Sequence, residues 1–177
     1  MIAVAGPSRG PGGGRGGFTM VEVLIVLAIV GVLATIAIPN FIRIFGAMRV
    51  EEETKRVYVD VVGARSRAVI TRRAAFVEFA ANRVRTFEDT APAPDGDGAL
   101  DAGADRRLAE DNVTHTVDTT GLGGTTLLAF DLDGVADGDG FFRLVSTVNP
   151  EYDCVRVEPT RIRVGKYDPT ADACNAK

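Results

Sequence analysis

The sequence contains few side chains that could carry out covalent chemistry. It has one histidine, His115, two cysteines and no tryptophan among 177 residues. His115 lies between two threonines in a β-type run, where a plain strand residue is a better interpretation than a catalytic base. No nucleophile, base and orienting acid stand in a recognisable catalytic arrangement. The sequence therefore predicts a protein that is not an enzyme and that needs no cofactor.

Four aspartates alternate with glycines and apolar residues in the stretch DLDGVADGDG. Carboxylate oxygens at this spacing would suit a calcium ion. The stretch is not an EF-hand, because the twelve-residue loop with its closing glutamate is absent. An acidic Asp-Gly turn between strands explains the same residues without an ion. Calcium and a plain turn are thus alternative interpretations of Asp131, Asp133, Asp137 and Asp139.

The chain divides by composition into three pieces. Residues 1–17 are rich in glycine and proline and carry Arg9 and Arg15, so they have little to bury. Val23 to Ile42 is a run of 20 residues without a charge, and as a helix it would span about 30 Å, the thickness of a bilayer's hydrocarbon core. Residues 43–177 carry 18 Lys+Arg and 23 Asp+Glu, a net charge of -5, and are long enough for one modest core.

Glu22 lies at the edge of the apolar segment. A charge costs roughly 2.5 to 3.5 kcal/mol at the centre of a membrane helix, and less near its end, so such a residue usually marks function. The N-terminus does not match a secretory signal peptide. The apolar part of a signal peptide is only roughly 7 to 15 residues long, and a small-residue cleavage site follows it. A plain membrane anchor, with Glu22 facing lipid headgroups, is the alternative.

The junction from Arg15 to Phe41, RGGFTMVEVLIVLAIVGVLATIAIPNF, resembles the class III leader and N-terminal helix of type IV pilins and type II secretion pseudopilins. The matching positions are the last leader residue, the first and fifth mature residues and two helix positions: Gly17, Phe18, Glu22, Gly31 and Pro39. The resemblance implies that a prepilin peptidase cuts between Gly17 and Phe18 on the cytoplasmic side and methylates the new N-terminus of Phe18.

The resemblance also implies that Glu22 directs assembly by pairing with the amine of a neighbouring subunit in a helical filament. Pairing two charges in a low dielectric offsets much of their desolvation. Pro39 cannot donate a backbone hydrogen bond, so a helix that runs through it should kink or locally open. Gly31 is a second weak point, and the family implies that the segment between them can lose helicity during assembly. A proline that simply marks the membrane exit is the alternative.

The remaining chain predicts a helix followed by strands. From Asn40 to about Phe76, small and apolar residues recur at helical steps: Val50, Thr54, Val57, Val61, Ala64 and Ala68. Short β-branched and aromatic runs bounded by Gly, Asp and Pro then follow. We predict an α+β, pilin-like fold in which a long N-terminal helix packs on a C-terminal antiparallel β-sheet head. The predicted parts are a leader (1–17), a transmembrane and assembly helix (18–42), an amphipathic helix stalk (43–76) and a head (77–177) with an exposed flexible loop (90–104).

The order of the later runs, with CVRVEPTRIRVG before a terminal cysteine, is similar to H-type (GspH) minor pseudopilins and FimT/FimU-like minor pilins. This resemblance favours a minor subunit over a major one. Arg161 and Arg163 lie on one face of a predicted strand. FimT-like proteins of DNA-uptake pili have a similar G-R-x-R motif that contacts DNA, although Thr160 replaces the glycine here. A DNA-binding pilus-tip subunit is therefore the alternative, which the acidic head disfavours.

The resemblance fixes an expected topology: a single pass through the bacterial inner membrane with the head in the periplasm. Cys154 and Cys174 would then pair in an oxidising compartment, and a closed loop of 21 residues would add about 3 kcal/mol. Two free buried thiols are the alternative.

Some pseudopilins bind calcium, which supports the calcium interpretation of the aspartate stretch. Expected partners are other pilin or pseudopilin subunits, the inner-membrane assembly platform, prepilin peptidase, the lipid bilayer and, in the alternative, DNA.

Overall fold

The computed structural model describes residues 17–94 and 96–176. The predicted leader therefore lies outside the described residues, apart from Gly17. By its internal contacts the chain divides into two compact units, Met1–Phe41 and Ile42–Lys177.

The described part of the first unit consists mainly of the beginning of helix α1, Met20–Thr71. Its apolar side chains are exposed almost throughout, from Met20 at 81% to Ile38 at 57%. A helix that is apolar on all sides needs an apolar environment rather than water. By length and composition α1 can cross a membrane, and it is the one such helix among the described residues.

Pro39 lies inside α1, and the residues on both sides of it are helical. The helix therefore does not end at this proline, although Pro39 has no N–H to give to the preceding turn. Loss of helicity between Gly31 and Pro39 during assembly stays a prediction.

In the second unit α1 is amphipathic. The stripe expected from the sequence is buried in full: Val50, Thr54, Val57, Val61, Ala64 and Ala68. Thr54 is its polar member, and its hydroxyl donates to the carbonyl of Val50 at 2.8 Å, which satisfies the buried donor. Arg72 follows the last helical residue with φ of 55°, the left-handed conformation common after helix ends. The helix thus ends at Thr71, before the predicted residue 76, and the first strand begins at Ala75.

Two antiparallel sheets follow, where the sequence predicted a single one. The first has the order β3-β2-β1-β5. Its strands are β1 Ala75–Ala80, β2 Arg83–Glu88, β3 Arg106–Asn112 and β5 Leu127–Phe130. The second has the order β4-β6-β7-β8-β9. Its strands are β4 Thr116–Asp118, β6 Gly140–Val145, β7 Cys154–Glu158, β8 Arg161–Asp168 and β9 Ala173–Ala176, with a 3-10 turn η1 at Thr120–Leu122.

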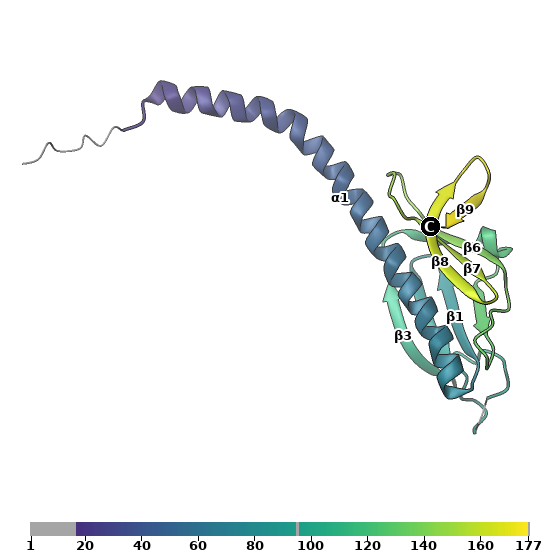
Figure 1. The fold of residues 1–177 in the computed structure, drawn as a ribbon. Coiled ribbons are helices and arrows are strands. Elements are labelled where there is room, and N and C mark those ends of the chain that lie inside the picture. Colours follow the sequence, from purple (N-terminus) through teal and green to yellow (C-terminus); the bar gives the residue numbers. More distant parts are fainter. Residues whose placement is uncertain (1–16, 95, 177) are drawn as a thin grey trace, which may run out of the picture. The chain divides into compact units, whose positions relative to one another are not determined.

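Both sheets share one hydrophobic core with α1. Val57 and Val61 of the helix belong to the same buried cluster as side chains of β1, β2, β5, β6 and β7. Phe79 of β1 and Phe142 of β6 join the two sheets, with ring centroids 4.7 Å apart. Figure 1 shows the strands gathered along the C-terminal half of α1. The fold is therefore α+β, as predicted, with a long helix followed by antiparallel sheets.

The predicted loop at 90–104 connects β2 to β3, and buried carboxylates hold both of its ends. Asp105 Oδ1 accepts the backbone N–H groups of Thr90 and Ala91 at 2.9 and 3.0 Å. Asp89 Oδ2 accepts the N–H of Gly98 at 2.7 Å. Burial raises the pKa of Asp89, because it disfavours the charged form. These hydrogen bonds hold Thr90, Ala91 and Gly98 in place, and the flexibility of the loop stays a prediction.

Candidate assembly and interaction sites

The N-terminus of α1 is capped by Thr19. Its hydroxyl oxygen accepts the N–H of Glu22 at 3.2 Å, and its carbonyl accepts the N–H of Val23 at 3.2 Å. Thr19 with Glu22 three residues later has the T-x-x-E spacing of a capping box. Glu22 is thereby held in the first turn, where a carboxylate interacts favourably with the helix dipole. Our sequence analysis missed this cap, although the spacing was readable.

Phe18, which precedes α1, and Glu22 in the first turn of the helix line the same hollow. With Val23, Val26 and Leu27 they line a shallow hollow of about 260 Å³. Phe18 is 83% exposed. The structure thus brings the predicted processing and assembly residues together. Gly31, further along α1, has no non-helical atom within 4 Å of the position that a Cβ would take.

The disulfide between Cys154 and Cys174 is present and joins β7 to β9. Both cysteines are buried and pack with Phe141 and the partly buried Tyr167. The bond therefore fixes the strand that ends the second sheet. The alternative of two free thiols is wrong for this structure.

The four aspartates of the predicted calcium stretch do not converge. Asp131 Oδ1 accepts the N–H groups of Asp133 and Val135, which closes a tight turn. Asp137 Oδ1 accepts the N–H of Ala129 and so covers the edge of β5. Asp139 pairs with Arg156 at 3.2 Å. Within the described residues no group of three or more His, Cys, Asp or Glu side chains could hold a metal ion. The turn interpretation accounts for these residues.

Arg161 and Arg163 lie on β8, as predicted, opposite one acid and one further arginine of β7. Glu158 of β7 accepts from Arg163 at 2.9 Å and lies 3.5 Å from Arg156. The strand register places Glu158 opposite Arg161 and Arg156 opposite Arg163. This face therefore carries three arginines and one glutamate, and a DNA contact through Arg161 and Arg163 stays a prediction.

His115 has a structural partner. Its Nδ1 lies 2.8 Å from Glu53 Oε2 of α1, and Glu53 also accepts the backbone N–H groups of Thr114 and His115. Burial would raise the pKa of Glu53, but the hydrogen bonds from His115 and Thr114 outweigh it and lower the pKa below 4.5. The contact ties the segment before β4 to the helix.

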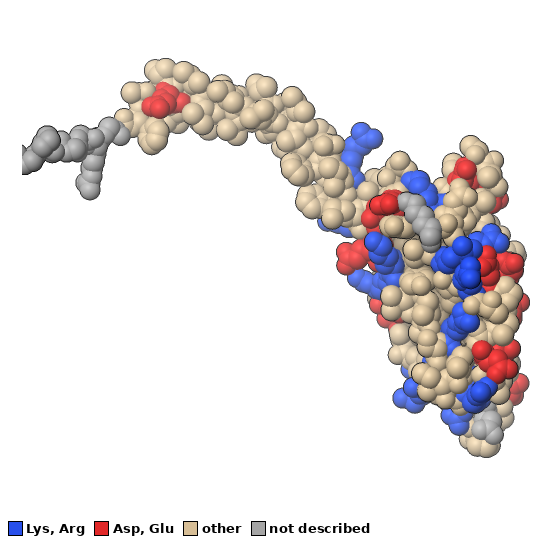
Figure 2. All heavy atoms as spheres, in the orientation of Figure 1, with Lys and Arg blue, Asp and Glu red and all other residues tan. Residues whose placement is uncertain are grey.

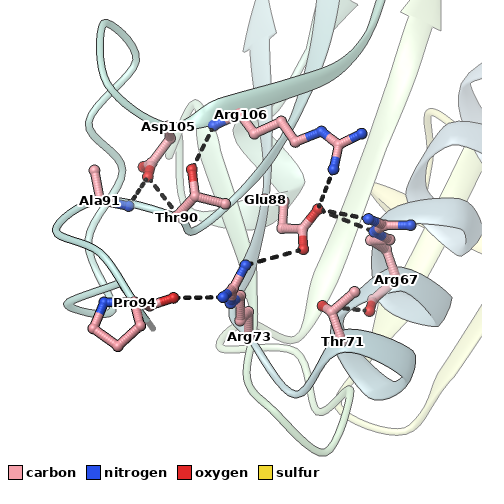
Figure 3. Close-up of polar contacts among 9 residues, drawn as sticks. All are labelled: Arg67, Thr71, Arg73, Glu88, Thr90, Ala91, Pro94, Asp105 and Arg106. Carbon is pink, nitrogen blue, oxygen red and sulfur yellow. Dashed lines mark hydrogen bonds and ion pairs between the residues drawn. The ribbon is translucent and has the colours of Figure 1, made fainter.

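A buried carboxylate at the end of β2 gathers three arginines, as Figure 3 shows. Glu88 is only 2% exposed. Arg67 of α1 donates through Nε to Glu88 Oε2 at 3.0 Å, and its Nη2 lies at 3.0 Å from the same oxygen. Arg73 and Arg106 lie further away, each at 3.9 Å. Arg73 also donates to the carbonyl of Pro94. A buried charge needs such partners, and they tie the end of α1 to β2 and β3.

Asp60, a carboxylate of α1, faces Asp111 of β3. Burial raises the pKa of Asp60 to about 7, the hydrogen bond and negative charge of Asp111 add to this effect, and Arg56 opposes it. The two carboxyls can therefore share a proton in the folded protein.

We expect the free energy of unfolding to fall as the pH rises from 3.8, the ordinary pKa, to about 7. In this window the folded state binds the proton more tightly than the unfolded state, so stability present at low pH is lost with rising pH. Urea unfolding of the full chain between about pH 5 and about pH 8 measures the slope. Asp60→Asn should flatten it, whereas Glu52→Gln on the exposed side of α1 should not. Equal slopes in all three proteins would contradict the shared proton.

Comparison with known proteins bears mainly on the first unit. Residues 13–38 match the family described as "Prokaryotic N-terminal methylation motif". The type IV major pilin protein PilA of Myxococcus xanthus (strain DK1622) is 56% identical over 39 residues, which make up 22% of this chain and 17% of PilA. The crystal structure of the type IV minor pilin FimU of Pseudomonas aeruginosa (strain PAO1) is similar with a TM-score of 0.48 and 14% sequence identity, over 72% of this chain and 93% of that chain.

Residues 13–38 of the chain thus carry a prokaryotic N-terminal methylation motif. The motif contains Gly17, Phe18, Glu22 and Gly31, and most of it lies in the exposed apolar part of α1. Motif and helix together indicate membrane anchoring.

Proposed function

We propose that this protein is a minor pilin or pseudopilin, a structural subunit of a type IV pilus or a type II secretion pseudopilus. Prepilin peptidase cuts between Gly17 and Phe18 and methylates Phe18. Before assembly the subunit is anchored in the inner membrane with its head in the periplasm. The assembly platform then moves it into a filament. The observation that carries this proposal is the match of residues 13–38 to the methylation motif, within and just before a helix able to span a membrane.

The geometry at the start of α1 supports the assembly step. After cleavage Phe18 would carry a positive amine at the positive end of the helix dipole, where it gains nothing from the helix itself. Glu22 lies one turn further along, in an apolar hollow that it shares with Phe18. Each subunit thus presents one positive and one negative group in apolar surroundings. Pairing them between neighbours offsets the desolvation of both charges and sets the register of the helices.

The disulfide supports the proposed position of the head, because disulfides form and persist in the periplasm and are rare in the cytosol. The charged and polar surface of the second unit agrees with an aqueous compartment.

Intact-mass analysis of the membrane-extracted protein tests the proposal. In cells with prepilin peptidase we expect a mass that corresponds to Phe18 onward plus one methyl group, and in cells without the peptidase the uncut chain. Gly17→Leu should block the cut, whereas Gly31→Ala, inside the helix, should leave it intact. An uncut chain that starts at Met1 in both strains would refute the proposal.

A further inference from the structure

A hollow of about 430 Å³ lies beside the first part of α1 that belongs to the second unit. The helix borders it on one side, and the segment 146–153, which joins β6 to β7, borders it on the other. Its lining residues are Arg43, Ile44, Ala47, Thr147, Val148 and Asn149. One cationic, two polar and three apolar residues thus line the same space, a mixture that suits an amphipathic ligand.

The segment 146–153 is held against α1 beside this hollow. A Cβ on Gly46 of the helix would lie 3.1 Å from Cγ1 of Val148, so the segment packs closely on the helix there. Further along α1, Glu51 Oε1 accepts the N–H of Glu151 at 2.8 Å. The hollow is therefore formed by two segments in direct contact with each other, and its position along the helix is fixed.

The hollow lies next to the end of the charge-free run of α1. Gly46 follows Ile42 by four residues, which is about 6 Å along the helix axis. A headgroup layer is roughly 5 to 8 Å thick, so a run from Val23 to Ile42 that fills the hydrocarbon core brings the hollow to the level of the headgroups. Beyond this run, the apolar residues Ile44 and Met48 are still 47% and 57% exposed, and lipid would cover them.

The charges beside the hollow are positive. Residues 43–50 of α1 contain two arginines and no acid. In Figure 2 blue spheres border the long tan stretch of the helix. Within the part of the chain that the structure describes, the guanidinium of Arg43 forms no hydrogen bond or ion pair. Lys166 donates to Oδ1 of Asn149 and to the carbonyl of Pro150, which places a second cation near the rim. An anion in the hollow would therefore give Arg43 a partner.

The acids nearest along the chain lie outside the hollow. The first acid of α1 after the apolar run is Glu51, about 13 Å beyond Ile42 and thus past a headgroup layer. Its carboxylate accepts the N–H of Glu151, which is exposed and is not one of the lining residues. Asp153 accepts the N–H of Tyr167 at 2.6 Å. From the apolar run outward, the arginine of the hollow thus comes before any of these acids.

We propose that this hollow binds the phosphate of a phospholipid headgroup while the protein is anchored in the membrane. The guanidinium of Arg43 matches a phosphate in charge and in its fork of donors. The hydroxyl of Thr147 and the amide of Asn149 supply further donors. Ile44 and Val148 provide apolar contacts for the adjoining part of the lipid. Such a contact would fix the head in one orientation on the bilayer surface. The inference rests on the membrane anchoring in the proposed function, but not on cleavage or filament assembly.

Binding of short-chain phosphatidylglycerol to the detergent-purified full chain tests the site, with native mass spectrometry as the readout. We expect Arg43→Gln to weaken this binding about fivefold, the effect of one arginine on the attraction to an anionic lipid. Arg107→Gln is the matched control, because it removes an exposed arginine of β3, and it should bind as the unaltered protein does. Diacylglycerol with the same acyl chains lacks the phosphate, so its binding should not depend on Arg43.

The depth of the segment 146–153 in the bilayer is a second, independent measurement. The chain has no tryptophan, so Thr147→Trp places a single reporter at an exposed position of this segment. In phosphatidylglycerol vesicles, a spin label on the lipid headgroup should reduce its fluorescence at least about twofold. Ile70→Trp is the control, because Ile70 is 76% exposed and lies about 42 Å beyond Ile42 along α1. Its fluorescence should not change.

Flotation of the chain with the vesicles separates the ways in which the inference can fail. A chain that does not float has no anchor, which contradicts both the proposed function and the inference. A chain that floats but shows equal quenching of Thr147→Trp and Ile70→Trp would overturn the headgroup site alone. Equal binding of phosphatidylglycerol by the unaltered protein and Arg43→Gln would do the same. Displacement of the lipid by an equal concentration of inorganic phosphate would also overturn it, because the hollow would then be a site for a soluble anion.

Discussion

Glu22→Ala is expected to leave the protein in the membrane fraction but to lower its incorporation into filaments at least about tenfold, which corresponds to about 1.4 kcal/mol. The apolar helix remains able to span the membrane, so insertion should not suffer. The neighbour's amine, however, would lose its counter-charge in a low dielectric, and an unpaired charge in such surroundings is strongly unfavourable. The measurement is the ratio of this subunit in sheared filaments to that in membranes, by quantitative immunoblot.

Two variants sharpen this experiment. Glu52→Ala removes an exposed acid of α1 in the second unit and should incorporate normally. Glu22→Asp keeps the charge but shortens its reach, so it should fall between the alanine variant and the unaltered protein. Normal incorporation of Glu22→Ala would show that the carboxylate does not act in assembly.

The helix could be predicted from the sequence because its signals are local. The charge-free run from Val23 to Ile42 requires nothing but length and composition. The stripe from Val50 to Ala68 follows the helical period, and the structure buries every position of it. The end of the helix was less predictable. It depends on the left-handed conformation of Arg72, a residue type that gives no such signal.

The strands divide according to their burial. The run AFVEFA is readable as a strand because β1 lies inside a sheet and buries side chains on both faces. By contrast, β3, RRLAEDN, gives little strand signal, since it is an edge strand with charged and mostly exposed side chains. The division into two sheets could not be predicted from the sequence either, because it depends on pairings between segments far apart in the chain.

The candidate sites show the same limit. Gly17, Phe18 and Glu22 form a contiguous motif, and the structure places Phe18 and Glu22 in one hollow. Arg161 and Arg163 suggested a cationic strand. Only the register reveals that the neighbouring strand brings both Glu158 and Arg156 to the same face. The arginines around Glu88 come from α1, β3 and the segment before β1, so no window of sequence contains them.

Phe142→Ala is expected to have the largest effect on the stability of the head, a loss of about 3 to 5 kcal/mol. Phe142 is fully buried, and its contact with Phe79 joins the second sheet to the first beneath α1. Truncation removes a large apolar side chain, leaves a cavity and breaks an aromatic pair worth about 0.5 to 1.5 kcal/mol beyond its area. Because a typical domain is stable by only about 5 to 15 kcal/mol, much of the margin would be lost.

Denaturant unfolding of the full chain in detergent measures this loss. Far-UV circular dichroism is the signal, because the chain has no tryptophan for fluorescence. Val59→Ala is the control, because Val59 lies on α1 in the same unit but is 62% exposed. It should change the free energy of unfolding by less than about 0.5 kcal/mol. A loss below about 1 kcal/mol for Phe142→Ala would mean that the two sheets unfold separately. In that case the end of α1 would pack on the first sheet alone.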